Sequence, residues 1–383
     1  MAGKSVAVLD VRSSEVAVFV GERDVNNTFN FKASKTESYG GYQDGEFYDV
    51  EEFARAVLNA LNSVEQVCGE KIKTLYIGVP GEFTEVVAKE QRLSFPKRVK
   101  ISGKEVNALL ESGKKNLDGF RYIRVSSMIY TTSDNRRVAN PEGIYSTGLS
   151  GILSYFYCSK YFVKTMERIL GGSKTVLRYL PTQLAMASYL LSPEARDEYA
   201  IFLDVGYLSS TISVLLGNGV LAQRSFWVGQ GQIAVRLMQR FKLPYEASVA
   251  LLQRSNLYLK KEAKSREFVF RGKTYDIPTE DFIDEVKAGL DEICEKVGDF
   301  LEECSGKELD TKPVFVTGEG LDGIRGALEH MSRRLNTVCE QVAPDLPYYN
   351  KPSMSSRISL MDMACEDNRM GGSLYRIFNV FGG

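Results

Sequence analysis

Two clusters of polar residues, each placed where an apolar run ends in Asp-Val, are the residues of this chain best suited to chemistry. The clusters are Asp10, Arg12, Ser13 and Ser14, and Asp204, Gly206, Ser209, Ser210 and Thr211. Carboxylates are ligands that Mg²⁺ prefers, and hydroxyls on tight turns can donate hydrogen bonds to a ligand. We therefore treat both clusters as candidate site residues.

Each cluster lies in the same local pattern. The segments 6–21 and 200–219 are both β-branched apolar runs interrupted by a short polar turn, which predicts strand, turn and strand in each. A repeated pattern of this kind predicts two related lobes that face each other.

Length and composition describe an ordinary globular chain. It has 383 residues, 44% of them hydrophobic, and a formal net charge of −1. This length favours more than one domain. Near-neutral charge without a concentrated basic stripe argues against nucleic-acid binding. No apolar stretch approaches the roughly 20 residues that cross a bilayer, and no secretory signal is visible, so we expect a cytoplasmic protein.

Several catalytic classes and covalent frameworks are not indicated. The six cysteines are scattered and His330 is the only histidine, so neither a zinc cluster nor a disulfide framework is expected. The Walker lysine, H-E-x-x-H and G-x-S-x-G motifs are missing from the sequence. Residues 318–323 satisfy G-x-G-x-x-G, but the segment after them does not continue as a dinucleotide-binding β-α-β unit.

The remaining patterns predict a first lobe interrupted by a compact insert. A helix over 49–67 and a buried strand over 73–79 complete the first lobe, and the pattern changes near Glu85. Strands over 84–94, 122–130 and 149–159 then alternate with helices over 103–115 and 160–170. We expect Lys97 to Lys100 to form a solvated strand edge and Trp227 to be packed within a strand.

The order and spacing of these segments resemble the bacterial cell-division protein FtsA, a family of the actin and Hsp70-like ATPase superfamily. The matching segments are Asn140-Pro141-Glu142-Gly143, the strand over 148–157 with its following helix, Arg178-Tyr179-Leu180-Pro181, the hairpin from Asp204, and the loop Thr317-Gly318-Glu319-Gly320. The likeness extends over essentially the whole chain, although each motif is degenerate.

The resemblance implies an α/β, actin-like two-lobed fold with a small α+β domain inserted in the first lobe. It divides the chain into a first lobe at 1–84, the insert at 85–162, the return of the first lobe at 163–197, and the second lobe at 198–383. In that superfamily two such hairpins bind the phosphates of one nucleotide from opposite sides, so the resemblance implies that both clusters, together with Thr317, Gly318 and Gly320, form one candidate nucleotide site.

Departures from the family pattern argue against efficient catalysis. Arg12 stands where the family has glycine, and Glu15 places negative charge where a cation would help. Tyr207 and Leu208 replace two glycines, and Thr211 replaces a carboxylate that positions magnesium. Because phosphoryl transfer needs preorganised positive charge and metal, we expect weak or absent ATP hydrolysis. We therefore expect either that the chain binds no cofactor or that it binds ATP with Mg²⁺. In the second case Arg12 would replace a cation that the family has at this site.

What the resemblance implies for function is a self-associating scaffold or adaptor in bacterial cell division or envelope assembly, with a partner such as the tubulin-like FtsZ. We expect the insert to present Tyr130, Tyr145 and Tyr155 at a contact with a neighbouring subunit or partner. Two alternatives stay open: an ATP-dependent assembly switch, and a pilus-assembly adaptor resembling PilM.

The end of the sequence bears on membrane contact. Leu374, Ile377, Phe378 and Phe381 form one apolar stripe at helical spacing. With few basic neighbours, this stripe fits a buried helix better than a membrane anchor. Membrane contact is therefore expected through a partner, or weakly through this helix, at the inner face of the membrane.

Overall fold

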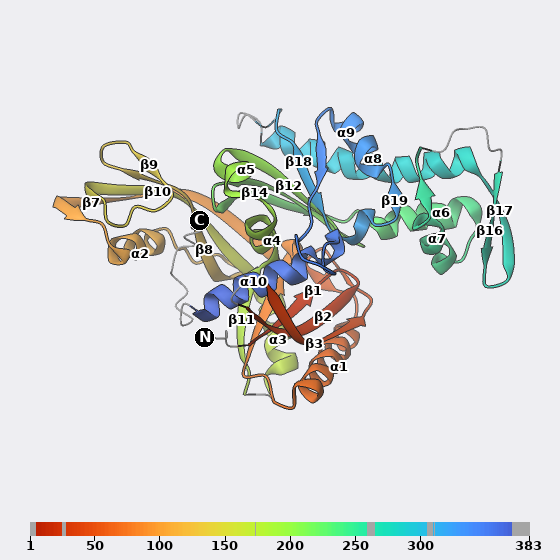
Figure 1. Ribbon diagram of the computed structural model, residues 1–383, viewed down its shortest axis with the longest axis horizontal. Coiled ribbons are helices and arrows are strands. Elements are labelled where there is room, and N and C mark those ends of the chain that lie inside the picture. The colour runs from red at the N-terminus through yellow and green to blue at the C-terminus, as the bar shows by residue number, and fades with distance from the viewer. Residues whose placement is uncertain are drawn as a thin grey trace.

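The computed structural model describes residues 5–24, 28–172, 174–258, 265–304, 309 and 311–369. Two lobes form the centre of an elongated molecule, the insert projects from one side, and helices with a hairpin project from the other (Figure 1). The apolar stripe that we predicted from Leu374 to Phe381 lies outside the described residues.

The first lobe is built on a five-stranded sheet in the order β11-β6-β1-β2-β3. Its strands are β1 (Val6–Val11), β2 (Glu15–Arg23), β3 (Phe29–Ser38), β6 (Thr74–Val79) and β11 (Val176–Pro181), beside the short β4 (Tyr42–Gln43) and β5 (Glu46–Phe47). Its helices are α1 (Val50–Cys68), α3 (Lys160–Leu170) and α4 (Thr182–Leu190). The predicted first helix is confirmed, and the Asp49 side chain caps it by accepting from the amide of Glu52 at 2.9 Å.

The second lobe repeats this sheet strand for strand, in the order β20-β18-β12-β13-β14. Its strands are β12 (Tyr199–Val205), β13 (Ser210–Leu216), β14 (Gly219–Phe226), β18 (Val314–Thr317) and β20 (Cys339–Gln341). In each lobe the first strand pairs antiparallel with the hairpin strand and parallel with the strand that follows the helix. The predicted duplication and the actin-like two-lobed fold are confirmed.

Further helices and short strands complete the second lobe. The helices are α5 (Pro193–Asp197), α6 (Gln230–Phe241), α7 (Tyr245–Leu252), α8 (Thr279–Glu303) and α9 (Ala327–Leu335). Two short pairs are β15 (Ser255–Asn256) with β19 (Ile324–Arg325), and β16 (Ser265–Phe270) with β17 (Lys273–Pro278). The period of two along β12 sends Phe202 into the core shared with the first lobe and Leu203 into the second lobe's own core.

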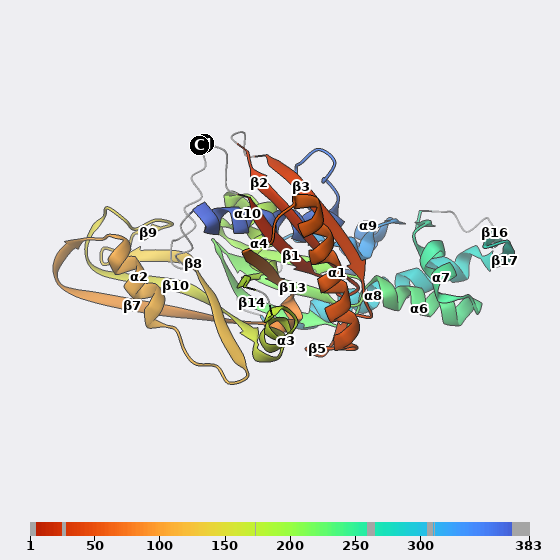
Figure 2. The ribbon, with the colours of Figure 1, turned by 90° about the horizontal axis from the view of Figure 1, so that it is seen from below.

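The insert is a four-stranded sheet, β7-β10-β8-β9, with one helix on one face. Its elements are β7 (Thr84–Lys100), α2 (Gly103–Ser112), β8 (Phe120–Thr132), β9 (Arg137–Val138) and β10 (Tyr145–Ser159). Figure 2 shows the insert extending well away from both lobes. Residues 97–100 lie at the end of the outermost strand and are mostly exposed, as predicted.

One prediction about the insert surface is wrong. Of the three tyrosines expected at its surface, Tyr130 and Tyr155 are fully buried, and only Tyr145 is exposed. The buried pair packs with Leu109 of α2 and Leu153 of β10 in the core of the insert. Side chains alternate between the two faces of a strand, and both rings point to the face that α2 covers. The sequence predicts the strands but not which of their faces the helix packs on.

A second correction concerns the last described helix, α10 (Ser355–Arg369). We assigned 198–383 to the second lobe, but α10 crosses back and packs against α4, β1 and β2 of the first lobe. Leu360 and Met361 are fully buried in that core. Asp367 of the same helix pairs with Arg124 of the insert at 3.1 Å, so α10 ties the first lobe to the insert.

The turn between β13 and β14 joins the second lobe to the insert. Arg196, only 2% exposed, donates to the Gly217 carbonyl at 2.8 Å and to Asn218 Oδ1 at 2.7 Å. The Ser154 hydroxyl of the insert donates to the carbonyl of Val220 at 2.8 Å. A buried guanidinium thus fixes the turn that the insert sheet contacts.

We predict that Gly217→Val separates the insert from the second lobe. Gly217 has φ of 55°, and a side chain there would meet the backbone of Met128. Gly143→Val is the matched control, because Gly143 has φ of 87° but an open surrounding. Left-handed strain alone costs about 1–2 kcal/mol, so the control sets that baseline. Denaturant unfolding should show a clearly larger loss for Gly217→Val; equal losses would contradict the proposed contact.

Candidate functional site

The two predicted phosphate turns meet between the lobes, and one guanidinium joins them. Arg12, which follows β1, donates to Asp204 of β12 through both terminal nitrogens, at 3.2 and 3.3 Å. The same side chain forms an ion pair with Glu319, in the turn after β18. The predicted residues Asp10, Arg12 and Asp204 are therefore brought together, and Arg12 lies at their centre.

Burial makes these charges interdependent. Asp10 is 0% and Arg12 is 8% exposed. Burial alone would lower the pKa of Arg12, but the carboxylates of Asp204 and Glu319 outweigh burial and raise the pKa well above its usual value. Burial raises the pKa of Asp10 and of Asp204, and Arg12 opposes that rise at both carboxyls. Arg12 therefore favours the charged form of both carboxyls.

Residues from α10 and α4 complete the enclosure. The Ser356 hydroxyl donates to Asp10 at 2.7 Å, and Arg357 lies 3.8 Å from the same carboxylate while pairing with Glu15. Gln183 of α4 donates to Asp204 at 3.4 Å. We did not predict Ser356, Arg357 or Gln183, because their positions in the sequence carry no turn or strand signal that links them to the two hairpins.

The predicted hydroxyl groups are engaged by the protein itself. Ser13 accepts from the Leu208 amide at 3.0 Å. The Ser210 hydroxyl donates to the carbonyl of Val228 at 2.6 Å. The hydroxyls of Thr211 and Thr317 are hydrogen-bonded to those of Ser225 and Ser355, at 2.8 and 2.7 Å. Ser14 and Ser209 contribute backbone carbonyls, which accept from the amides of Tyr39 and Gly206 at 3.1 Å each. The hydroxyls of Ser13, Ser210, Thr211 and Thr317 are thus bound within the protein, whereas Asp10 Oδ1 and Glu319 Oε1 are buried without a hydrogen-bond partner in the described part of the chain.

Packing accounts for the glycines of the candidate site. Gly318 has φ of 95°, and a side chain there would meet Asp204 and the carbonyl of Val205. A Cβ at Gly320 would lie 2.5 Å from the carbonyl of Gly206. These glycines let the turn after β18 approach the end of β12 closely.

The bulky replacements fill space between the turns. The Tyr207 hydroxyl lies 2.7 Å from that of Tyr245 in α7. Leu208 packs against Gly41 of the first lobe and Gly231 of α6. Side chains of this size occupy the approach that glycines would leave open.

The residues present do not fit magnesium and a nucleotide phosphate. Asp204 is bound by Arg12, and Asp10 accepts from Ser356 through Oδ2 while its Oδ1 has no hydrogen-bond partner among the described residues. The negative charge of Glu319 beside them opposes a phosphate. Within residues 5–369 as described, no group of three or more His, Cys, Asp or Glu side chains is arranged to hold a metal ion. Magnesium requires oxygen ligands in near-octahedral geometry, which this arrangement does not offer.

Trp227 corrects another prediction. It lies after β14 in a bend and is 39% exposed, so it is not packed within a strand. It lines a cavity of about 580 Å³ together with Glu82, Glu85 and Tyr161. Of the six cysteines, which are free thiols, five are buried and Cys68 is half-buried.

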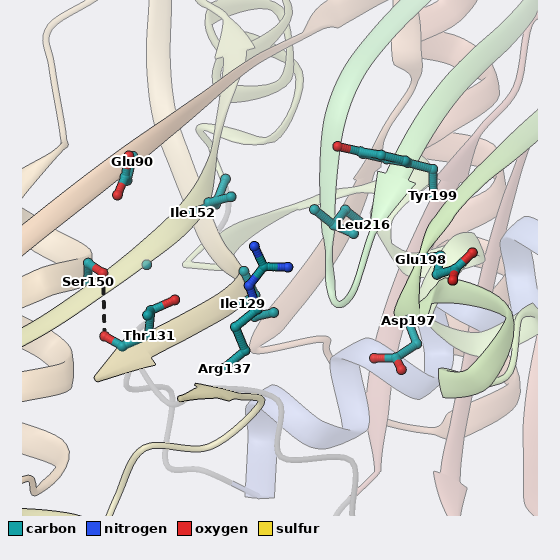
Figure 3. A pocket seen from close by; sticks show the side chains of 11 residues that line it. Glu90, Ile129, Thr131, Arg137, Ser150, Ile152, Asp197, Glu198, Tyr199 and Leu216 are labelled. Atoms are coloured by element: carbon teal, nitrogen blue, oxygen red, sulfur yellow. Dashed lines mark hydrogen bonds between the residues drawn. The ribbon is translucent and has the colours of Figure 1, made fainter. Parts of the chain in front are cut away.

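A separate cavity of about 450 Å³ lies between the insert and the second lobe (Figure 3). Ile129 and Ile152 line it from the insert, and Tyr199 and Leu216 line it from the second lobe. Arg137 of β9 points into it (Figure 3). None of the predicted phosphate-site residues lines this cavity, so the two places are distinct.

Solved structures with this architecture were found by comparison. The PilM–PilN type IV pilus biogenesis complex matches with a TM-score of 0.61 and 14% identity, over 94% of this chain and 98% of that chain. MreB 5 of Spiroplasma citri bound to AMPPNP gives 0.57 and 10%, over 96% and 99%. EutJ of Carboxydothermus hydrogenoformans gives 0.53 and 11%, over 94% and 89%. These matches show an actin-like two-lobed fold.

Sequence comparison gives a fainter signal. No protein-family model matches the chain. The cell division protein FtsA of Streptococcus pneumoniae is 22% identical over 215 residues, which is 54% of this chain and 46% of that protein. The chain therefore spans about half the length of the curated relative that it matches. In the described residues, no helix has both the length and the apolar character that a membrane span needs.

We predict that Arg12→Met destabilises the protein in a pH-dependent way. Removing one partner of a buried ion pair costs about 3–5 kcal/mol, because the other charge stays buried. Asp10 and Asp204 already have raised pKa values, and losing Arg12 raises them further. A raised carboxyl pKa favours folding at low pH and this contribution is lost as pH rises, so the deficit should shrink from pH 8 towards pH 5.

Arg136→Ala is the matched control for this measurement. Arg136 pairs with Asp134 at 2.8 Å, but both side chains are 55% exposed. Exposed pairs contribute about 0–1 kcal/mol, so this variant should unfold like the wild type at every pH. A small, pH-independent effect of Arg12→Met would show that Arg12 does not hold the buried carboxylates.

Proposed function

We propose that this chain is an actin-like scaffold or adaptor in bacterial cell division or envelope assembly, and that it works without hydrolysing ATP. The observation that carries the proposal is the bridge from Arg12 to Asp204 and Glu319. In an actin-like fold the equivalent turns would have to hold a metal and phosphates; here the protein's own guanidinium joins them. The lobes are thereby held together with no ligand.

Hydrolysis lacks its requirements in this arrangement. Phosphoryl transfer depends on positive charge and metal placed around the transferred group. Arg12 supplies one positive charge, but two carboxylates already pair with it. A bound polyphosphate would be repelled, because the carboxylates of Asp10, Asp204 and Glu319 surround the one charge of Arg12, and Arg357 beside Asp10 is already paired with Glu15.

In this proposal the first lobe comprises residues 1–84 and 163–197 together with α10, the insert comprises residues 85–162, and the second lobe comprises the described chain from residue 198 up to α10. Self-association and binding to an FtsZ-like or other envelope protein are proposed from the resemblance to FtsA, together with a peripheral place at the inner face of the membrane. A fixed two-lobed body with a projecting insert offers separate surfaces for a second copy and for a partner (Figure 1).

A second candidate role is a pilus-assembly adaptor. It is favoured by the match to PilM in its complex with PilN, which extends over nearly the whole of both chains. Both roles use the same physical property, a body whose lobes are held by an internal ion pair. The identity of the partner separates them, and affinity capture with the full chain from its own cells would identify that partner.

We predict no ATP turnover above a blank. Tyr207 and Leu208 fill space that a magnesium-bound phosphate would need. Arg12 is paired with Asp204, one of the carboxylates that would hold the ion. Phosphate release should equal that of buffer with Mg²⁺ and ATP. Turnover that Asp204→Ala abolishes would contradict the proposal and would support the alternative of an ATP-dependent assembly switch.

We also predict that self-association does not respond to nucleotide. Sedimentation of the full chain over a range of concentrations should show a mass that rises with concentration, because association follows mass action. The curve should be the same with and without Mg²⁺ and ATP. A monomer at every concentration would contradict self-association, and a curve that ATP shifts would contradict the nucleotide-independent scaffold.

A further inference from the structure

The insert combines an open strand edge with concentrated positive charge. β7 is the outermost strand of its sheet, so one side of its backbone has no partner strand in the described part of the chain. Its far end lies at the extremity of the molecule (Figure 1). We propose that this edge binds an extended acidic segment of a partner protein, which joins the sheet as an additional strand.

The backbone of β7 limits where such a segment can bind. At its start, β14 of the second lobe covers the strand, and Gln223 donates to the carbonyls of Gly81 and Thr84 at 3.2 and 3.5 Å. Regular pairing with β10 continues to Ser94. Pro96 follows and has no amide hydrogen to donate. The available edge is therefore residues 89–95, which is an ordinary strand length.

The face of β7 toward α2 packs against the core of the insert. Leu93 and Phe95 pack against the core beneath α2. The Ser112 hydroxyl at the end of α2 donates to Gln91 at 3.2 Å. Because the strand is already ordered, an added strand gains main-chain hydrogen bonds without the cost of ordering β7.

The charge beside the edge determines the chemistry of the partner. Arg92 pairs with Glu90 at 2.7 Å. Lys97, Arg98 and Lys100 are exposed and form no ion pair within the described residues. Arg98 lies 6.0 Å from the ring of Tyr145, which is itself 55% exposed. Three uncompensated cations at the end of a free strand favour a segment that ends in carboxylates.

The same charges act against pairing with a second copy. A two-fold antiparallel pairing of the available edge, residues 89–95, would centre on Arg92 and set it opposite Arg92 of the second copy. Like charges directly opposite each other destabilise a strand pair. The edge is thus selective for an acidic strand over its own copy.

An anionic membrane would also attract these cations, but it would make no use of the strand edge. Membrane recognition by charge alone usually takes a cluster of about four to eight basic residues. The open backbone and the charge together favour an extended peptide. The inference depends on the insert alone and not on the proposed lack of ATP hydrolysis.

The test uses fluorescent peptides in which Thr and Val alternate and the end carries either glutamates or lysines. Binding to the full-length protein is followed by fluorescence anisotropy. We expect the glutamate peptide to bind and the lysine peptide to bind at least about tenfold more weakly, a difference of about 1.4 kcal/mol. The combined change Lys97→Glu, Arg98→Glu and Lys100→Glu should reverse this preference.

The matched control changes three exposed cations outside the insert, Arg55→Glu, Lys73→Glu and Lys174→Glu. This variant carries the same change in net charge and should keep the wild-type preference. Thermal unfolding of both variants confirms that they are folded. A control that also loses the glutamate peptide would overturn the site, since net charge alone would then explain binding.

Backbone methylation separates strand addition from simple charge attraction. Two glutamate peptides are made, one methylated on every odd amide and the other on every even amide. Because one edge of a strand presents alternate amides, one methylated peptide should bind and the other should not. Equal binding of both would overturn strand addition. Binding to phosphatidylserine vesicles that the insert variant loses, with no binding of the glutamate peptide, would assign the cations to a membrane and overturn the proposal.

Discussion

The bridge from Arg12 to Asp204 and Glu319 is the interaction on which the arrangement of the two lobes depends. It connects the first turn of one lobe to two elements of the other in a largely buried place, where the Glu319 side chain is 23% exposed and the other two less. Ions in such a place are costly unless they are paired, so each of the three charges requires the others. The bridge therefore provides a connection between the lobes that is made entirely by the chain.

The other connections support the same closed body. Helix α10 carries Ser356 and Arg357 to the bridge and Asp367 to the insert, so the bridge, the first lobe and the insert share one element. Arg196 fixes the turn that the insert contacts from the other side. A movement of the lobes that opened the Arg12 bridge would therefore also disturb contacts at the insert, and the insert is held in a defined position relative to both lobes.

Much of the fold can be predicted from the sequence, because strong periodic patterns of apolar residues indicate its strands and helices. The repeated apolar runs ending at Asp10 and Asp204 predict two hairpins, and the duplicated sheets confirm them. The packing of α10 on the first lobe could not be predicted, because nothing in the local pattern of residues 355–369 specifies which lobe it covers. The burial of Tyr130 and Tyr155 depended on which face α2 occupies, which is a tertiary property.

The site followed only in part. The sequence predicts that Asp10, Arg12 and Asp204 lie together, but it does not predict that Glu319 pairs with Arg12. The sequence showed that Arg12 replaces a glycine, but a residue type does not reveal the direction of its side chain. The contacts of Ser356, Arg357 and Gln183 depend on chain segments far apart in sequence, so no motif could indicate them.

The central claim is that an internal ion pair holds the lobes closed in place of a nucleotide. Small-angle X-ray scattering of the wild type and of Arg12→Met, each with and without Mg²⁺ and ATP, tests this claim most directly. Measurements at the lowest usable concentration keep association from masking the shape. The account predicts the same radius of gyration for the wild type in both conditions and a larger one for Arg12→Met. A wild type that becomes more compact only when Mg²⁺ and ATP are added would contradict it.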